Sequence, residues 1–292
     1  MSRKTLVLFN PYSGKKKARS KLTALQDKLQ GNKIPFDILE TKEHDNVNHI
    51  REYLNSSFTD LVVLGGDGTL NHAINAIINK DIIISIIPSG TGNDFIKNIQ
   101  VGKSLGEQMD TAIHGAPTAI DVGQCDDRLF INGVGIGFDG QIVYDMLNKH
   151  SILKGHAKYY AQVLRILATY SPQPLGFKID EDQQRLDTFL LVIGNGSTFG
   201  GGFVLTPGAS INDGLLDICH IGQLSPLKRF MNIHRLSSGT HAVLSEVKLS
   251  QTTHIKIDAA PGIQAHIDGE YLGTPPFNIK ILPEYIKVRV LS

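Results

Sequence analysis

The sequence has few cysteines, no long apolar run and almost no net charge. Its two cysteines, Cys125 and Cys219, form no Cys-x-x-Cys pair and no disulfide framework, which favours a reducing compartment. The longest apolar run, 82–87, is far shorter than a membrane span. The basic N-terminus has a short apolar run and no small-residue cleavage signal after it, unlike a signal peptide. We therefore expect a cytoplasmic protein.

The charge balance excludes further classes of protein. A net charge of +1 gives no molecule-wide field of the kind that nucleic-acid binding requires, so we expect no nucleic-acid partner. The histidines show no zinc-ligand spacing. Residues 1–30 are an exception, because this segment contains eight Lys and Arg residues and only one acidic residue, Asp27, which gives a local charge of +7.

Glycine is abundant, at 29 of 292 residues, above the usual level of about 7%. In the first 120 residues or so, continuous apolar strands alternate with helical patterns, which indicates a parallel sheet covered on both faces. Ligands of such sheets bind beyond the carboxyl ends of the strands. The predicted strands cover 5–10, 36–41, 61–64 and 82–87, and the helices cover 18–29, 46–54 and 70–78.

After about Gly123 the pattern changes to successive strands with few helices, which favours an antiparallel sandwich or a barrel. The chain is also long enough for two domains at about 150 residues each. We predict an α/β domain over 1–123 and a second, strand-rich domain over 124–292, with the last residues free to return to the first domain. Strands are predicted over 129–134, 177–180, 188–194, 215–221, 253–257 and 264–267, and helices over 140–149, 159–170 and 226–237.

Three loops at the predicted strand ends combine glycine with polar residues. Glycine lets backbone N–H groups approach a phosphate, and the N-terminus of a helix favours an anion. Each loop alone could equally be a tight turn or a helix cap, but three at corresponding positions favour an anion site. The loops are Asn10-Pro11-Tyr12-Ser13-Gly14, Gly65-Gly66-Asp67-Gly68-Thr69-Leu70-Asn71 and Pro88-Ser89-Gly90-Thr91-Gly92-Asn93-Asp94-Phe95.

Other nucleotide and hydrolase motifs are incomplete. Gly102-Lys103-Ser104 resembles the end of a P-loop, but Lys97 stands where that motif needs glycine. The segment 135–140 matches G-x-G-x-x-G, yet the acidic residue of a dinucleotide site is missing, so we interpret its glycines as close backbone packing. The sequence also lacks the G-x-S-x-G elbow of α/β-hydrolases.

Together, the three loops resemble those of the diacylglycerol kinase catalytic-domain family of lipid kinases, above all its small bacterial members. The likeness continues through Asp121, the glycines of 194–202 and Asp268-Gly269-Glu270. NAD kinases share the G-G-D-G-T motif and phosphofructokinases have a near form of it. The third loop and the late D-G-E separate the candidates. The resemblance implies a Rossmann-like first domain, similar to that of NAD kinases and phosphofructokinases, and a C-terminal β-sandwich.

The resemblance also implies a reaction, in which the γ-phosphoryl group of ATP passes to a hydroxyl of a diacylglycerol-like lipid in phospholipid metabolism. Glu270 matches the general base, with Asp268 beside it and Asp67 as a further catalytic residue. Asp67, Asp94 and Asp121 match a carboxylate network around Mg²⁺ and water. The implied nucleotide-binding residues are Asn10 to Gly14, Thr41, Gly65 to Asn71, and Thr91.

A second, structural Mg²⁺ is held in some bacterial members by a loop like the one at 210–215. The matching residues are Ser210, Asp213 and the backbone carbonyl of Leu215. Asp213-Gly214 is also a common turn dipeptide, so the loop has an ordinary interpretation as well.

A lipid acceptor implies transient, peripheral contact with a membrane surface. The basic segment with Lys15, Lys16, Lys17 and Arg19 is one candidate for this contact, at about 1 kcal/mol per charge on an anionic surface. ATP attraction and an ordinary solvated helix face are alternative interpretations. The region 159–170, with Lys154, Lys158 and Arg165 nearby, is a second candidate, and core packing explains it equally well. The oligomeric state stays open, a homodimer included.

Two other functions compete with a lipid kinase. An NAD kinase-like small-alcohol kinase should carry a segment like G-T-P-T-G-S-T-A-Y, which this sequence lacks. A catalytically weak nucleotide-binding regulator would have lost acidic residues of the site, whereas Asp67, Asp94, Asp121 and Glu270 are intact.

Overall fold

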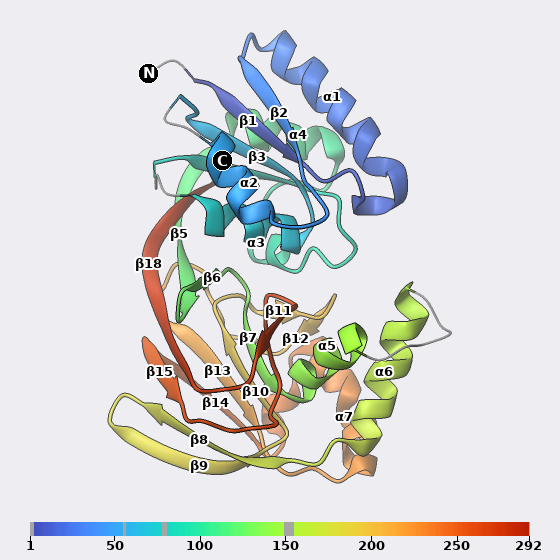
Figure 1. Cartoon of the computed structure of the whole chain (residues 1–292), viewed down its shortest axis with the longest axis vertical. Helices are drawn as coiled ribbons and strands as arrows, with labels where there is room; N and C mark the ends of the chain where they lie inside the picture. The colour runs from blue at the N-terminus through green and yellow to red at the C-terminus, as the bar shows by residue number, and fades with distance from the viewer. Residues whose placement is uncertain (1–2, 55–56, 78–80, 149–154, 292) are drawn as a thin grey trace. The chain divides into compact units, whose positions relative to one another are not determined.

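The chain divides into two compact units in the computed structural model (Figure 1). Unit 1 contains residues 1–122 and 282–292, and unit 2 contains residues 123–281. The structure describes residues 3–54, 57–77, 81–148 and 155–291, without the side chains of 15–17 and 155–158. The chain passes between the units along two strands, β5 (Ala116–Cys125) and β18 (Phe277–Val290).

Unit 1 is built on a parallel sheet with the order β2-β1-β3-β4, followed by the end of β18 beside β4. Its strands are β1 (Thr5–Phe9), β2 (Phe36–Glu40), β3 (Asp60–Gly65) and β4 (Ile83–Pro88). Its helices are α1 (Lys17–Gly31), α2 (Asn46–Tyr53), α3 (Asp67–Ala76) and α4 (Leu105–His114), with short turns η1 (Ser13–Lys16) and η2 (Phe95–Asn98).

Both faces of this sheet are buried. On one face, Val7, Phe9 and Val62 pack with Leu25 of α1 and Met109 of α4. The neighbouring strand residues point the other way and are also fully buried, on the side of α2 and α3. This double burial explains why the strands read as continuous apolar runs in the sequence.

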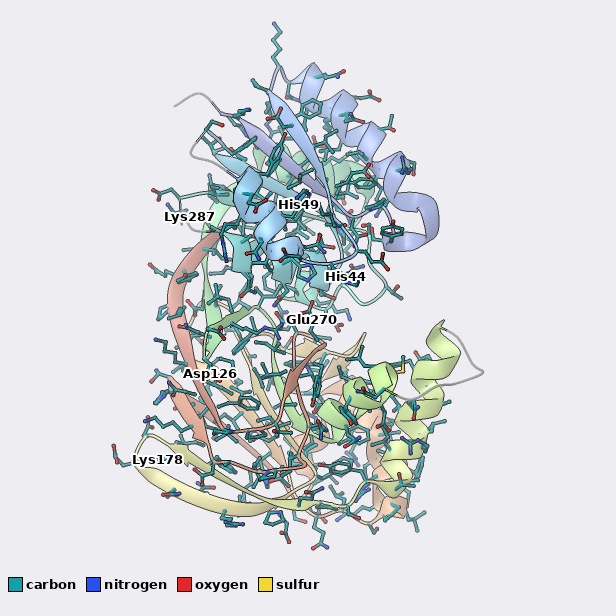
Figure 2. All side chains as sticks on the ribbon, viewed as in Figure 1. His44, His49, Asp126, Lys178, Glu270 and Lys287 are labelled. Carbon is teal, nitrogen blue, oxygen red and sulfur yellow. The ribbon has the colours of Figure 1, made fainter. Side chains whose placement is uncertain are left out.

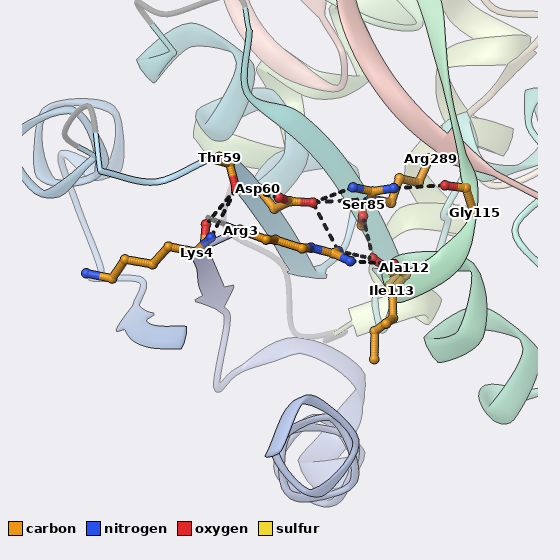
Figure 3. Close-up of polar contacts among 9 residues, drawn as sticks. All are labelled: Arg3, Lys4, Thr59, Asp60, Ser85, Ala112, Ile113, Gly115 and Arg289. Carbon is orange, nitrogen blue, oxygen red and sulfur yellow. Dashed lines mark hydrogen bonds and ion pairs between the residues drawn. The ribbon is translucent and has the colours of Figure 1, made fainter. Parts of the chain in front are cut away.

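A buried ion cluster fixes the last strand to unit 1 (Figure 3). Asp60, at the start of β3, lies 3.0 Å from Arg3 and 2.7 Å from Arg289 near the end of β18. The Arg289 guanidinium also donates to the carbonyl oxygen of Gly115 at 2.9 Å. Residues from the beginning, middle and end of the chain therefore meet around one carboxylate.

Unit 2 is a β-sandwich with helices on one outer face. One sheet has the order β14-β13-β10-β7-β16-β17, and the other places β18, β15, β8 and β9 side by side, with the β5–β6 hairpin also paired to β18. The strands are β6 (Arg128–Phe130), β7 (Gly133–Gly137), β8 (Gln173–Ile179), β9 (Asp182–Thr188), β10 (Leu190–Gly194), β11 (Thr198–Phe199), β12 (Phe203–Val204), β13 (Leu216–Ile221), β14 (Val247–Thr252), β15 (His254–Ile257), β16 (Ala265–Ile267) and β17 (Glu270–Gly273).

Alternation of side chains along the strands builds two apolar layers in unit 2. Between the sheets, Ile136 and Ile193 pack with Phe177 and Ile255. On the other face of the first sheet, side chains such as Val192 pack with the helices. Those helices are α5 (Phe138–Asn148), α6 (Gly155–Thr169) and α7 (Pro226–Ser238), with the turn η3 (His241–Val243).

The predicted fold class, an α/β domain followed by a β-sandwich, is confirmed. Several local predictions were wrong, and the long strands β5 and β18 were not predicted. The strand predicted over 129–134 is two strands, because the amides of 131–133 donate to Asp268 instead of a neighbouring strand. Helix α3 begins at Asp67, three residues earlier than predicted. Helix α4 was not predicted at all. None of the helices in the described part of the chain is long and apolar enough to cross a membrane.

Candidate functional site

A pocket of about 570 Å³ lies in unit 1 at the carboxyl ends of its four parallel strands. Each strand end contributes to the wall. The lining residues are Asn10, Tyr12 and Ser13 after β1; Thr41, Lys42, Glu43 and Asn46 after β2; Gly66, Gly68, Thr69 and His72 after β3; and Gly90 after β4. The three glycine loops of the sequence therefore face one cavity, as expected for the carboxyl edge of a parallel sheet.

Direct contacts join the three loops. The amide of Asn10 donates to the Thr69 hydroxyl at 3.1 Å, and the hydroxyl oxygens of Ser13 and Ser89 are 2.5 Å apart. A Cβ atom added to Gly90 would lie 2.6 Å from the Cα atom of Gly66. Any side chain at position 90 would thus separate the second loop from the third, so glycine is needed there for close approach.

Helix α3 presents its N-terminus at this pocket. Gly66 occupies the N-cap position without a side-chain hydrogen bond, so no side chain caps the first amides of the helix. Uncapped amides and the helix dipole together favour a bound anion. The loop before η2 is held by Asn93, whose side chain accepts from the Gly90 amide at 3.0 Å and donates to the Gly90 carbonyl at 2.8 Å.

Asp67 begins α3 and ties it to the third loop. Its carboxylate accepts from the backbone amides of Asp94 at 3.0 Å and Phe95 at 3.2 Å. Burial raises the pKa of Asp67, the two amides oppose this, and the charge of Asp94 raises the pKa further. Asp94 is itself buried and lies 2.7 Å from the Lys97 ammonium group.

Asp121 lies in the middle of β5 and makes other contacts. It is almost fully buried and accepts from the amide of Glu284 at 2.8 Å. Across the described residues, no three or more His, Cys, Asp or Glu side chains form a group able to hold a metal ion. Asp67 and Asp94 nevertheless fit a hard cation, because both supply oxygen ligands and a cation would offset their mutual repulsion.

Unit 2 carries the Asp268-Gly269-Glu270 turn between β16 and β17. The Asp268 carboxylate accepts from three consecutive amides, those of Ile131, Asn132 and Gly133, each at 2.9 Å. Both of its oxygens are thus used in holding the backbone, so Asp268 acts as an anchor of the turn. The catalytic role that the resemblance implies for Asp268 stays a prediction.

Glu270 follows this anchor at the start of β17 (Figure 2). Its carboxylate is partly exposed and lies 2.8 Å from the guanidinium group of Arg128 on β6. A carboxylate at a partly exposed position on a fixed turn can accept a proton from a bound hydroxyl, which is what a general base must do.

The loop at 210–215 forms a compact turn. The Ser210 hydroxyl donates to the Asn212 side chain at 2.8 Å, and the Leu215 amide donates to Asp213 at 3.0 Å. Burial, and then the charge of Asp213, raise the pKa of Asp217. A structural metal at Ser210, Asp213 and Leu215 stays a prediction.

Several predicted residues do not line the pocket. Leu70 and Asn71 are buried within α3, and Thr91 is exposed next to Gly90. The other predicted nucleotide-binding residues outside the lining are Pro11, Gly14, Gly65 and Asp67. The sequence missed the pocket residues Lys42, Glu43, Asn46 and His72, although the first three follow the predicted strand that ends at Thr41. The side chains of Lys15, Lys16, Lys17 and Lys158, and the whole of Lys154, lie outside the described residues.

Known proteins match nearly the whole chain. Residues 4–125 match the diacylglycerol kinase catalytic domain, and residues 132–290 match the YegS C-terminal NAD kinase beta sandwich-like domain. A diacylglycerol kinase of Staphylococcus saprophyticus is 28% identical over 99% of this chain and 95% of its own length. One of Mycobacterium tuberculosis is 29% identical over 98% of this chain and 94% of its own. A crystal structure of a diacylglycerol kinase from Bacillus anthracis superposes with a TM-score of 0.75 at 22% identity, over 99% of this chain and 97% of its own, which shows a shared fold.

Proposed function

Because the chain belongs to the diacylglycerol kinase catalytic-domain family, we propose that it transfers the γ-phosphoryl group of ATP to the hydroxyl group of a diacylglycerol-like lipid. The pocket in unit 1 supports this proposal most directly. It joins three glycine loops and the uncapped end of α3 at the carboxyl edge of a parallel sheet. This arrangement suits the triphosphate of a nucleotide.

Different residues have different roles in the proposed reaction. Backbone amides of the three loops and of α3 hold the phosphates, and Thr41, with the residues that follow it, forms the wall at the end of β2. Asp67, Asp94 and Asp121 carry the oxygen ligands proposed for Mg²⁺ and its water shell. Bound Mg²⁺ would supply positive charge that neutralises the phosphate oxygens.

Glu270 is the proposed general base. In phosphoryl transfer the acceptor oxygen attacks in line with the leaving group, and a nearby carboxylate takes the hydroxyl proton as the new bond forms. The anchored turn of Asp268 holds the backbone of Glu270 in place for this task.

We also propose that the lipid acceptor is met at a membrane surface by peripheral contact. The support is chemical, because a diacylglycerol-like substrate is confined to a bilayer. Two candidate regions were named for this contact, the basic segment 15–19 and the region 159–170. Each has a cationic side chain that the structure describes, Arg19 on α1 and Arg165 on α6. Exposed apolar side chains on α6, Tyr160 and Leu164, are consistent with such contact.

A transfer assay tests the function. The protein is incubated with labelled ATP and Mg²⁺, in parallel with diacylglycerol in mixed micelles, a total lipid extract and NAD, and the products are analysed by mass. We expect a phosphorylated lipid and no labelled NAD. Label in NAD alone would instead identify an NAD kinase, and tight nucleotide binding without any product would favour a regulator.

A substitution tests the base. Glu270→Gln should reduce lipid phosphorylation about a thousandfold, because the substitution removes the proton acceptor. Equilibrium binding of ATP should be unchanged, because neither Glu270 nor its ion-pair partner Arg128 lines the pocket of unit 1. Glu181→Gln is the matched control, since Glu181 is almost fully exposed in the same unit. Full turnover by Glu270→Gln would falsify the assignment.

A further inference from the structure

A histidine–aspartate pair lies directly behind the turn that carries Glu270. His266 of β16 is buried, and its Nε2 atom lies 3.1 Å from Oδ2 of Asp139 at the start of α5. On the other side of the ring, the amide of Gly269 donates to Nδ1 at 3.3 Å. A backbone amide can only donate, so Nδ1 is an acceptor and the proton of the neutral ring lies on Nε2, toward Asp139.

Two glycines in the surrounding backbone leave the space that this pair occupies. A Cβ atom at Gly135 would lie 1.9 Å from Oδ2 of Asp139 and 2.5 Å from Nε2 of His266. At Gly140 a Cβ atom would lie 2.2 Å from the carbonyl oxygen of Gln264. The G-x-G-x-x-G segment, which is not a dinucleotide motif here, thus leaves room for the pair and brings α5 against β16. Asp139 is further fixed by the Gly140 amide at 2.8 Å.

The pair completes the support of the turn. Asp268 and Gly269 both have positive φ angles, +47° and +85°, the conformation that an Asp-Gly hairpin turn prefers. Asp268 holds one side through the amides of 131–133, and His266 holds the Gly269 amide. The Gly269 amide comes directly before Glu270, so its orientation sets where the Glu270 side chain begins.

We propose that Asp139 and His266 are positioning residues for Glu270: the imidazole holds the Gly269 amide beside Glu270, and Asp139 holds the imidazole. The role of Glu270 rests on the proposed function. Asp139 keeps the neutral ring in the tautomer that accepts from Gly269, much as second-sphere carboxylates orient histidines elsewhere.

Other charged and titratable groups lie near His266. Asp139 faces it from α5, and Glu270 and Tyr271 follow on β17, with Tyr271 directly opposite in the ladder. Asp268 lies in the turn, and Arg128 of β6 is paired with Glu270. The facing strand β7 brings no titratable side chain.

Two substitutions of His266 distinguish the loss of the Nδ1 acceptor from the loss of the ring itself. His266→Asn places an amide oxygen near the position of Nδ1 and cannot titrate, whereas His266→Gln extends toward Asp139 and leaves Gly269 without its acceptor. We expect kcat to fall roughly ten- to a hundredfold in His266→Gln, with the KM for ATP unchanged, and to be largely restored in His266→Asn. Asp139→Asn should lower kcat by a similar factor.

The comparison of the two His266 variants is the decisive kinetic measurement. The amide oxygen of His266→Asn can replace the Nδ1 acceptor, so the difference in kcat between His266→Gln and His266→Asn reports the hydrogen bond to Gly269. His220→Gln is the matched control, because it removes a buried imidazole of the same unit on β13 and should leave kcat unchanged. Normal kcat in His266→Gln, or an equal loss in His266→Gln and His266→Asn, contradicts the proposal.

A measurement that does not depend on catalysis tests this inference separately from the proposed function. With ¹⁵N-glycine labelling, the Gly269 amide resonance should keep its position in His220→Gln, shift strongly in His266→Gln, where its acceptor is lost, and shift less in His266→Asn. An unchanged resonance in His266→Gln overturns the inference whatever the kinase assay gives. If no lipid is phosphorylated but the resonance shifts in this way, the proposed function fails and the hydrogen bond to His266 stands.

Discussion

Asp268 and Glu270 are two residues apart and make different contacts. The sequence motif places both at the same catalytic centre, but three backbone amides use the oxygens of Asp268, whereas Glu270 is partly exposed and ion-paired with Arg128. Only the contacts reveal this division, because Ile131, Asn132 and Gly133 are more than 130 residues away in the sequence. No signal in the sequence near Arg128 indicated its partner.

Buried histidines away from the site make the stability of unit 2 depend on pH. Burial lowers the pKa of His220 to about 4, below the ordinary 6.5, and the nearby Lys248 adds to this. The unfolded chain therefore binds a proton before the folded one does. The stabilising contribution of neutral His220 is full above about pH 6.5 and is lost as the pH falls toward about 4, and His241 acts in the same direction.

We expect the free energy of unfolding of unit 2 to fall by up to about 1.4 kcal/mol per pH unit across this window, from His220 alone. Hydrogen exchange of unit 2 amides between pH 7 and pH 4 measures it. The dependence should be weaker in His220→Gln and unchanged in His44→Gln, where the histidine is exposed on unit 1 (Figure 2). Equal slopes in all three proteins would contradict the role of His220.

Helix α4 shows how local signals can be present and overlooked. Ser104 accepts from the Glu107 amide at 3.2 Å, and the Glu107 carboxylate accepts from the Ser104 amide at 2.9 Å, which makes a complete capping box. The pattern Ser-x-x-Glu is visible in the sequence and predicts a helix start. The same serine ended the false P-loop segment, and its actual contacts are those of a cap.

The cap gives a prediction at the level of the element. Ser104→Ala should reduce the free energy of unfolding of unit 1 by about 1 kcal/mol, because one amide of the first turn loses its acceptor. Ser20→Ala, in the interior of α1, exchanges the same atoms without removing a cap and should cost much less. Denaturant-dependent hydrogen exchange of α4 amides measures both, and an equal loss in the two variants would argue against the capping role.

At the scale of the molecule, the chain returns to unit 1 after completing unit 2. Strand β18 pairs with β15 through 277–280 and with β4 through Lys287 and Val288. Beyond this ladder, Arg289 reaches the buried carboxylate of Asp60. Residues 282–292 are thus part of the fold of unit 1, although the chain reaches them last.

Removal of this last contact should destabilise unit 1. Arg289→Met leaves buried Asp60 with Arg3 as its remaining cationic partner, at a cost of roughly 3 kcal/mol. Lys287→Met, two residues earlier on β18, is the matched control, because Lys287 is half exposed and lies 3.9 Å from Asp81 (Figure 2). It should cost less than about 0.5 kcal/mol.

The chain has no tryptophan, so hydrogen exchange of unit 1 amides is the suitable measurement for this pair of variants. A large loss in Arg289→Met and almost none in Lys287→Met is the expected result. Similar values for both would show that the buried cluster adds little to the stability of unit 1.

The sequence by itself determined the strands β1 to β4 and the helices α1 to α3, the fold class and the glycine loops. These depend on local periodicity and on motifs within a few neighbouring residues, which a single chain displays directly. Tertiary structure decided what required contact between distant residues. Gly66 meets Gly90, Asp268 binds the amides after β6, and His266 faces Asp139, each across a separation that no local pattern encodes. The abundant glycines illustrate both the local and the tertiary contribution. Their positions are read from the sequence, whereas the groups that pack against them are known only from the fold.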